Sequence, residues 1–290
     1  MKRTDVYELV RYGCERGVRM AMTPSVTPLL TPGAVRGLAA EGLSRIAFSL
    51  DGSCPHVHDS FRGVFGSFAR TMEMIGVARA AGLSVQINTT VSRHNLQDLT
   101  AITELLRGQD LDLWSVFFLV PVGRGQADQR IAPREYEEVF ELLWSLRQQV
   151  RFEIKTTEAP HYRRFVLQKM KQERHPGAAR RDFRYASMNV NDGRGFVFVS
   201  HKGEVFPSGF LPLSVGSVRT SRLADLYRQA PLLRELRSVD RVEGKCGECE
   251  YRKVCGGSRA RSWSLTGDPF AAEPDCAYQP GGKSLSVLNA

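Results

Sequence analysis

Arg45–Gly52 reads RIAFSLDG, and this stretch decides the fold class. A short apolar run that stops at a turn pair such as Asp51-Gly52 predicts a buried strand followed by a polar loop. Two similar runs come later in the chain, SVQINTTV over Ser84–Val91 and LWSVFFLV over Leu113–Val120. A shorter run, Val18–Met22, precedes them. The first half of the chain therefore predicts a set of buried strands.

Helical patterns separate these strands. The predicted helices cover residues 5–15, 31–40, 68–81, 96–106 and 133–148. The second begins at Thr31-Pro32, an N-cap residue followed by a proline in the first turn. Strands joined by single helices need crossover connections, so the sheet should be parallel, with helices on its faces. The fold class is α/β, either a doubly wound sheet or a (β/α) barrel of the TIM type.

Polar residues follow the strands at the edge where such folds place their chemistry. Hydroxyl groups and a carboxylate there could bond a ribose, and an arginine between glycines could bind a carboxylate through two hydrogen bonds. Serine, threonine and aspartate are also ordinary turn and cap residues, so each one alone proves nothing. No G-x-G-x-x-G and no P-loop motif occurs, which argues against a dinucleotide or P-loop site. The strand-end segments that could form such a small-molecule site are Thr23–Ser25, Ser49–Gly52, Asn88–Thr90 and Pro121–Gly125.

The second half of the chain changes character after about residue 150. A strand over 151–157 is expected, then a basic stretch over 163–184, then a hairpin formed by 195–199 and 205–206. Lys and Arg number 40 against 31 Asp and Glu, a net charge of +9, and the basic stretch predicts a solvated helix face and loop. No nucleic-acid-binding signature, membrane-length apolar run or signal peptide is present. The expected location is the cytoplasm, with neither nucleic acid nor membrane as a partner.

Four of the six cysteines lie close together near the end of the sequence. Cys246, Cys249, Cys255 and Cys276 are spaced C-x2-C-x5-C-x20-C, while Cys14 and Cys54 stand alone. In a cytoplasmic chain this spacing predicts metal ligation rather than disulfides. Four thiolates suit tetrahedral zinc and also a [4Fe-4S] cluster, and the spacing does not separate the two. The histidines His161, His175 and His201 are expected at the surface or in the hairpin, outside this set.

Several longer segments resemble the radical SAM enzymes that carry a C-terminal SPASM domain. They are SLDG (49–52), HDSFRGVFGSF (58–68), QINTTVSRHN (86–95), PVGRG (121–125), GEVFPSGFLPL (203–213), CGECEYRKVCGGSRARSWSLTGDPF (246–270) and Asp275-Cys276. The resemblance implies a partial (β/α) barrel over residues 1–150, a basic linker or helical region over 151–194, and a SPASM-type iron–sulfur domain over 195–290. It also implies that Ser25, Ser49, Asp51, Asn88 and Arg124 help to hold S-adenosylmethionine.

The chain departs from the SPASM pattern C-x2-C-x5-C-x3-C at one position. Arg259 stands where the x3 cysteine would be, and Ser208 stands where an upstream cysteine is expected. In the family these missing cysteines hold a second auxiliary cluster. The four cysteines that remain match the ligands of one auxiliary [4Fe-4S] cluster, which favours iron–sulfur over zinc.

A second departure concerns the radical chemistry itself. The family carries a C-x3-C-x2-C loop that binds the cluster that cleaves S-adenosylmethionine, and a GGEP-like segment after the second strand; this sequence has neither. Met1–Tyr7 resembles the sequence that follows GGEP, so the expectation is a truncated barrel without its first strands, inactive as it stands. An intact form would abstract hydrogen from a peptide or small molecule, as in members near haem and peptide-maturation pathways, with an electron-donor protein as a further partner.

Two other hypotheses use the same residues. In the first, the cysteines bind zinc and stabilise a non-catalytic module whose basic face meets an anionic partner. In the second, the chain is an ordinary α/β enzyme that uses only the residues at the strand ends.

Overall fold

The computed structural model describes residues 2–172 and 191–282. The chain divides into two compact units. The sheet unit comprises Met1–Phe117 and Leu142–Lys155, and the cysteine unit comprises Phe118–Glu141 and Thr156–Ala290.

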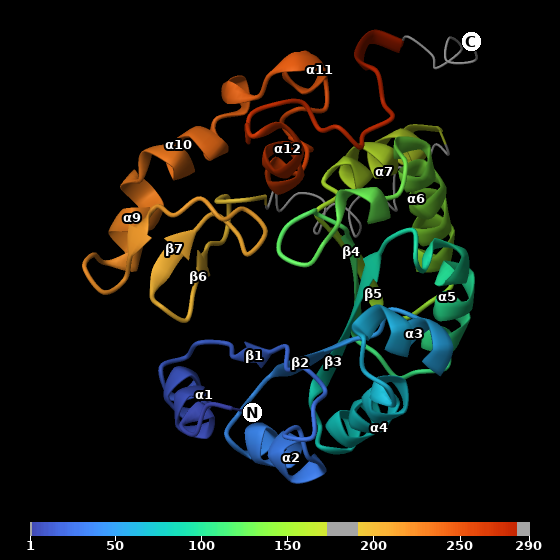
Figure 1. Ribbon diagram of the computed structural model, residues 1–290, viewed down its shortest axis with the longest axis vertical. Helices are drawn as coiled ribbons and strands as arrows, with labels where there is room; N and C mark the ends of the chain where they lie inside the picture. The colour runs from blue at the N-terminus through green and yellow to red at the C-terminus, as the bar shows by residue number, and fades with distance from the viewer. Residues whose placement is uncertain (1, 173–190, 283–290) are drawn as a thin grey trace. The chain divides into compact units, whose positions relative to one another are not determined.

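A five-stranded sheet organises the first unit (Figure 1). Its strands are β1 (Ala21–Met22), β2 (Arg45–Ser49), β3 (Ser84–Val91), β4 (Leu113–Phe118) and β5 (Glu153–Thr157), in the order β1-β2-β3-β4-β5. β2 pairs in parallel with both β1 and β3. The predicted α/β class with a parallel sheet is confirmed. The predicted strands are found as well, although β1 covers only the end of Val18–Met22.

Helices connect these strands as the periodicity predicts. They are α1 (Val6–Glu15), α2 (Pro32–Ala40), α3 (Pro55–Arg62), α4 (Ser67–Ala80), η1 (Leu96–Asp98), α5 (Leu99–Arg107) and α6 (Pro133–Arg147), the last shared by both units. The Thr31 hydroxyl accepts the Ala34 N–H at 3.1 Å, as expected for the N-cap of α2. Helix α3 was not predicted from the sequence. The fully buried side chains of Phe48, Ile87 and Trp114 belong to the core of this unit.

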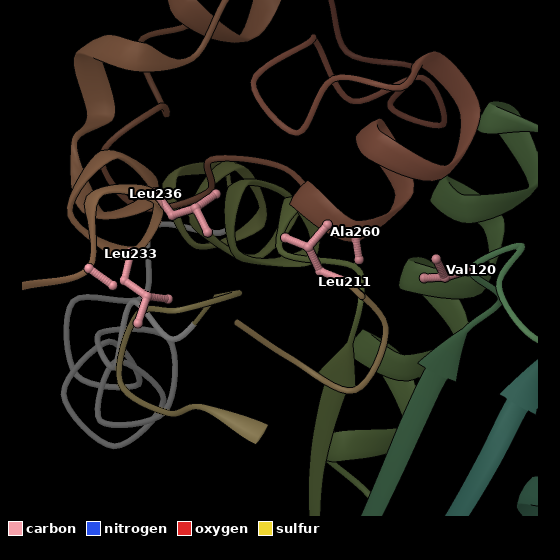
Figure 2. Packing of buried hydrophobic residues seen from close by; sticks show 6 residues of the cluster. Val120, Leu211, Leu233, Leu236 and Ala260 are labelled. Atoms are coloured by element: carbon pink, nitrogen blue, oxygen red, sulfur yellow. The ribbon is translucent and has the colours of Figure 1, made fainter. Parts of the chain in front are cut away.

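The cysteine unit contains shorter elements. They are η2 (Ala127–Gln129), α7 (His161–Gln172), β6 (Phe198–Val199), β7 (Glu204–Phe206), β8 (Gly216–Ser217), α9 (Leu223–Gln229), α10 (Pro231–Arg237), η3 (Val239–Arg241), α11 (Gly244–Gly247), α12 (Arg259–Thr266) and η4 (Pro280–Gly282). β6 and β7 form the predicted antiparallel hairpin, and β8 adds to β7. Figure 2 shows the apolar cluster of this unit, where Leu233 and Leu236 of α10 belong to the same core as Leu211 and Ala260.

The first part of the basic stretch is not a solvated face. Arg164 is only 4% exposed and forms an ion pair with Glu137, and Lys169 pairs with Glu141 at 2.6 Å. The prediction was wrong here because α7 turns these cations toward carboxylates of α6. Lys171 is exposed, as predicted, and Arg163 is half-buried. Arg174, Arg180, Arg181 and Arg184, together with His175, lie outside the described residues. Within residues 2–172 and 191–282, the search for a helix of membrane-spanning length and hydropathy finds none.

Candidate metal centre

The cysteine unit brings the four late cysteines to one cavity. Cys246, Cys249, Cys255 and Cys276 all line it, although Cys276 is 21 or more residues beyond the others in the sequence. None of the four is in a disulfide. The sequence prediction that these residues act as one set is consistent with this arrangement.

Glycines shape the chain around the cysteines. A Cβ on Gly247 would lie 2.4 Å from the Val242 carbonyl oxygen, so no larger residue fits directly after Cys246 without a shift. Gly256 and Gly257 follow Cys255 with φ values of 71° and 66°, in the left-handed region that glycine tolerates best. These turns let the backbone curve around the thiols.

Backbone N–H groups point at two of the sulfurs. Glu273 N donates to Cys246 Sγ at 3.2 Å, and Gly257 N donates to Cys255 Sγ at 3.4 Å. Such bonds favour the thiolate form that binds metals. Burial works in the opposite direction: it raises the pKa of Cys276 to about 11 and raises the pKa of Cys249 and Cys255. A positive centre bound in the cavity would overcome this effect, because thiolate ligation releases the protons.

The cavity wall also carries cations and a histidine. Lys245 Nζ donates to the Cys276 carbonyl oxygen at 2.5 Å, and the Arg164 guanidinium lies 5.1 Å from the centroid of the Tyr278 ring. His161 lines the cavity as well and is fully buried. The prediction that His161 lies at the surface is therefore wrong, while His201 is exposed in the hairpin turn as predicted.

A network of buried charges adjoins the cavity. Arg261 is 0% exposed and pairs with Glu273 at 3.1 Å and with Asp275 at 3.3 Å. It also donates to the carbonyl oxygens of Phe118 and Glu158, which belong to the same unit. These contacts hold Glu273, which donates to Cys246, and Asp275, which precedes Cys276.

Glu158 is the most unusual member of this network. Its φ of 59° is the only positive value at a residue other than glycine in the described parts of the chain. Burial and neighbouring carboxylates raise its pKa to about 8, and its carboxylate accepts the Ser258 hydroxyl at 2.5 Å. Glu158 directly follows β5 and was not singled out in the sequence, where no periodic or motif signal marks it.

The two positions that depart from the SPASM pattern come together in the structure. Arg259 is 2% exposed and Ser208 is 2% exposed. The Asp192 carboxylate interacts with both, accepting a hydrogen bond from Ser208 and lying within the field of the Arg259 charge. Arg259 also donates to the carbonyl oxygens of Pro269 and Ala271. The two positions where the family pattern has cysteines therefore hold buried polar side chains, Arg259 and Ser208, that interact with Asp192.

In the sheet unit, three of the predicted small-molecule contacts lie close together. Ser49 on β2 is the register partner of Asn88 on β3. Asp51, directly beyond β2, is fully buried: its carboxylate accepts the Thr90 N–H at 2.7 Å and pairs with Arg62 at 2.6 Å. Asp51 therefore holds the ends of β2 and β3 together.

The other two predicted contacts lie in exposed loops. Ser25 follows β1, and its carbonyl oxygen accepts the Thr27 N–H at 2.9 Å. Arg124 follows β4 in the cysteine unit, next to Gly123, which has a φ of 61°. The two isolated cysteines, Cys14 and Cys54, lie in the sheet unit at α1 and before α3.

The described residues contain no group of three or more His, Cys, Asp or Glu side chains arranged around a single metal ion. The donor chemistry nevertheless suits a thiolate-bound cluster, because four thiols, two N–H···S bonds and the cations Arg164, Lys245 and Arg252 share one cavity. Cleavage of S-adenosylmethionine requires another set of cysteines. The 290 residues include no C-x3-C-x2-C motif.

Comparison with known proteins identifies the relationship. No family model matches the chain. An AdoMet-dependent heme synthase of Methanosarcina barkeri is 39% identical over 98% of this chain and 81% of its own length. A PqqA peptide cyclase of Ruegeria pomeroyi is 26% identical over 99% of this chain and 74% of its own length. The crystal structure of Streptococcus suis SuiB shares the fold, with a TM-score of 0.71 at 14% identity over 96% of this chain and 64% of SuiB. This chain belongs to the radical SAM family.

Proposed function

We propose that the chain is part of a radical SAM enzyme that modifies an iron tetrapyrrole, and that its cysteine unit holds one auxiliary [4Fe-4S] cluster. The ligands are Cys246, Cys249, Cys255 and Cys276. The observation that carries this proposal is their convergence on one cavity. A cluster bound there would supply one-electron chemistry.

The residues of this chain prepare that cavity. Glu273 and Gly257 donate N–H groups to two sulfurs, while Arg164 and Lys245 offset the negative charge of four thiolates. Arg261 fixes Glu273 and Asp275, the residues that position Cys246 and Cys276. We further propose the division that the resemblance implies: a partial radical SAM barrel over 1–150, a basic linker or helical region over 151–194, and a SPASM-type iron–sulfur domain over 195–290.

S-adenosylmethionine is the second proposed cofactor, and its site belongs to the strand ends. Ser49 and Asn88 stand side by side at the ends of β2 and β3, and Ser25 and Arg124 occupy exposed loops beyond β1 and β4. Asp51 supports the site indirectly: its carboxylate already accepts the Thr90 N–H and pairs with Arg62, so it holds the strand ends and does not bind the cofactor itself. Arg124 suits the amino-acid carboxylate of the cofactor, since guanidinium groups bind carboxylates through two hydrogen bonds.

The substrate class follows the relative with the higher identity. The heme synthase is 39% identical and the peptide cyclase 26%, so a tetrapyrrole is the better proposal, with a peptide as the rival. An electron-donor protein is the expected partner in either case.

Anaerobic reconstitution with iron and sulfide tests the cluster. We expect about four irons per chain, with visible absorption typical of a [4Fe-4S] centre. Cys246→Ala and Cys276→Ala should each abolish stable binding, whereas Cys14→Ala and Cys54→Ala serve as matched controls and should keep all the iron. One zinc per chain without iron would refute the iron–sulfur proposal and favour a zinc module.

The same preparation tests the substrate class. Haem added to the reconstituted chain should bind at one equivalent with a shifted Soret band, and a short peptide should not displace it. Displacement by the peptide would favour the peptide rival. The 290-residue chain incubated with dithionite and S-adenosylmethionine should release no 5′-deoxyadenosine, because it has no C-x3-C-x2-C.

A further inference from the structure

His161 is a buried polar side chain without a partner. It begins α7, is 0% exposed, and neither ring nitrogen has a hydrogen-bond partner within the described residues. The ring packs 5.1 Å from the Tyr136 ring and 5.0 Å from the Phe140 ring. An imidazole carries at least one N–H in every protonation state, and a buried N–H without an acceptor is costly. Its place in the fold therefore needs an acceptor that residues 2–172 and 191–282 do not supply.

The other charged groups on the same cavity wall do not fill this need. Arg164, Lys245 and Arg252 are donors only. The Glu273 carboxylate already accepts three hydrogen bonds: Oε1 from Arg261 and the Asp275 N–H, and Oε2 from the Ser258 N–H at 2.6 Å. The wall thus offers donors to whatever occupies the cavity. The occupant that accepts several N–H groups at once is a cluster whose sulfides and thiolates are acceptors.

We propose that His161 donates an N–H hydrogen bond to a sulfur of the centre held by the four cysteines and raises its reduction potential. This inference rests on the proposed function. Hydrogen bonds to cluster sulfurs stabilise the reduced, more negative state, and ligand-supporting groups tune metal centres in this way. Arg164 and Lys245 act in the same direction through their charge. His161 is a positioning residue for the cluster, and no ligand role is assigned to it.

Spectroelectrochemical titration of the reconstituted full chain tests the proposal. His161→Phe keeps an aromatic ring against Tyr136 and Phe140 but removes the donor. We expect its one-electron reduction to become about tenfold less favourable, a fall of about 59 mV in midpoint potential. His161→Gln retains an N–H donor and should recover at least half of that loss. His201→Phe makes the same chemical change at an exposed residue and should leave the potential unchanged.

Iron content separates the two proposals. If the unaltered chain binds no iron–sulfur cluster, the proposed function fails. If all variants bind about four irons and His161→Phe has the potential of the unaltered chain, the function stands and the role of His161 is refuted. Equal potentials for His161→Phe and His161→Gln, both lowered, would also refute it, because the loss would then follow from packing and not from the donor. If His161→Phe loses its iron, His161→Gln decides the outcome: it must bind the cluster at a potential close to that of the unaltered chain.

Discussion

The sheet unit and the cysteine unit bury different kinds of side chain. In the sheet unit, the largest fully buried groups include Trp114 and Phe48, whose strands form a continuous parallel sheet. In the cysteine unit, Arg261 is fully buried with Glu273 and Asp275, and α12 buries four consecutive residues, Arg259–Ser262. Apolar burial stabilises the first unit directly. The second retains charges that need partners, which is the interior expected around an inorganic centre.

Removing the proposed cluster should affect the two units most unequally. After chelation of iron, we expect the amides of residues 244–276 to lose at least a hundredfold of their hydrogen-exchange protection, because metal binding and folding are coupled in such segments. The amides of β2 and β3 should change by less than threefold. Exchange measured by mass spectrometry on the loaded and stripped chain gives both values. An equal loss of hydrogen-exchange protection in both units would contradict the view that only the cysteine unit depends on the cluster.

The next largest effect is expected from removing the buried cation of the network formed by Arg261, Glu273 and Asp275. Arg261→Met keeps an unbranched apolar side chain but leaves Glu273 and Asp275 without their buried cation, which should cost about 3–5 kcal/mol of the free energy of unfolding. Arg130→Met is the matched control. Arg130 also pairs with Asp275 but is 23% exposed at its side chain, so its loss should cost about 1 kcal/mol. Urea unfolding of the loaded chain measures both, and equal effects would show that burial is not the cause.

The contrast also explains what the sequence could predict. The strands Arg45–Leu50, Ser84–Val91 and Leu113–Val120 were predicted because a strand buried on both faces is apolar along its length, a local signal. The four cysteines were found because the C-x2-C spacing is itself local. The places of His161 and Glu158 depend on contacts with residues about 100 positions away, such as Glu273 and Ser258, and no local pattern records them. Helix α3 was missed although its link to α4 is local: Asp59 accepts N–H groups from Gly66 and Phe68, seven and nine residues later.

The sheet unit has a pH-sensitive contact of its own. His58 is 1% exposed and accepts the Asp51 N–H through Nδ1 at 3.0 Å, and burial lowers its pKa to about 4. The unfolded ring takes up a proton near pH 6.5, so stability is complete above that pH and falls as the pH drops toward 4. Between pH 7.5 and 5 the loss should be about 2 kcal/mol.

His58→Asn retains an acceptor and removes the titration, so the β2 and β3 amides of this variant should lack that pH dependence. Hydrogen exchange corrected for intrinsic rates at the two pH values measures it. The same slope in both proteins would assign the effect to another group.

The smallest test compares one kind of contact in the two units. Thr31 caps α2 through the Ala34 N–H, and Ser258 caps α12 through the Arg261 N–H at 3.0 Å. Thr31→Ala should cost about 1 kcal/mol, the usual value of an N-cap. Ser258→Ala should cost about 2 kcal/mol, because its hydroxyl also donates to the half-buried Glu158 carboxyl group, which would lose that donor. Chemical denaturation of both variants measures the difference. If the two substitutions lower the free energy of unfolding equally, the hydrogen bond from Ser258 to Glu158 adds no stability. The buried charges of the cysteine unit would then stabilise one another less than their hydrogen bonds indicate.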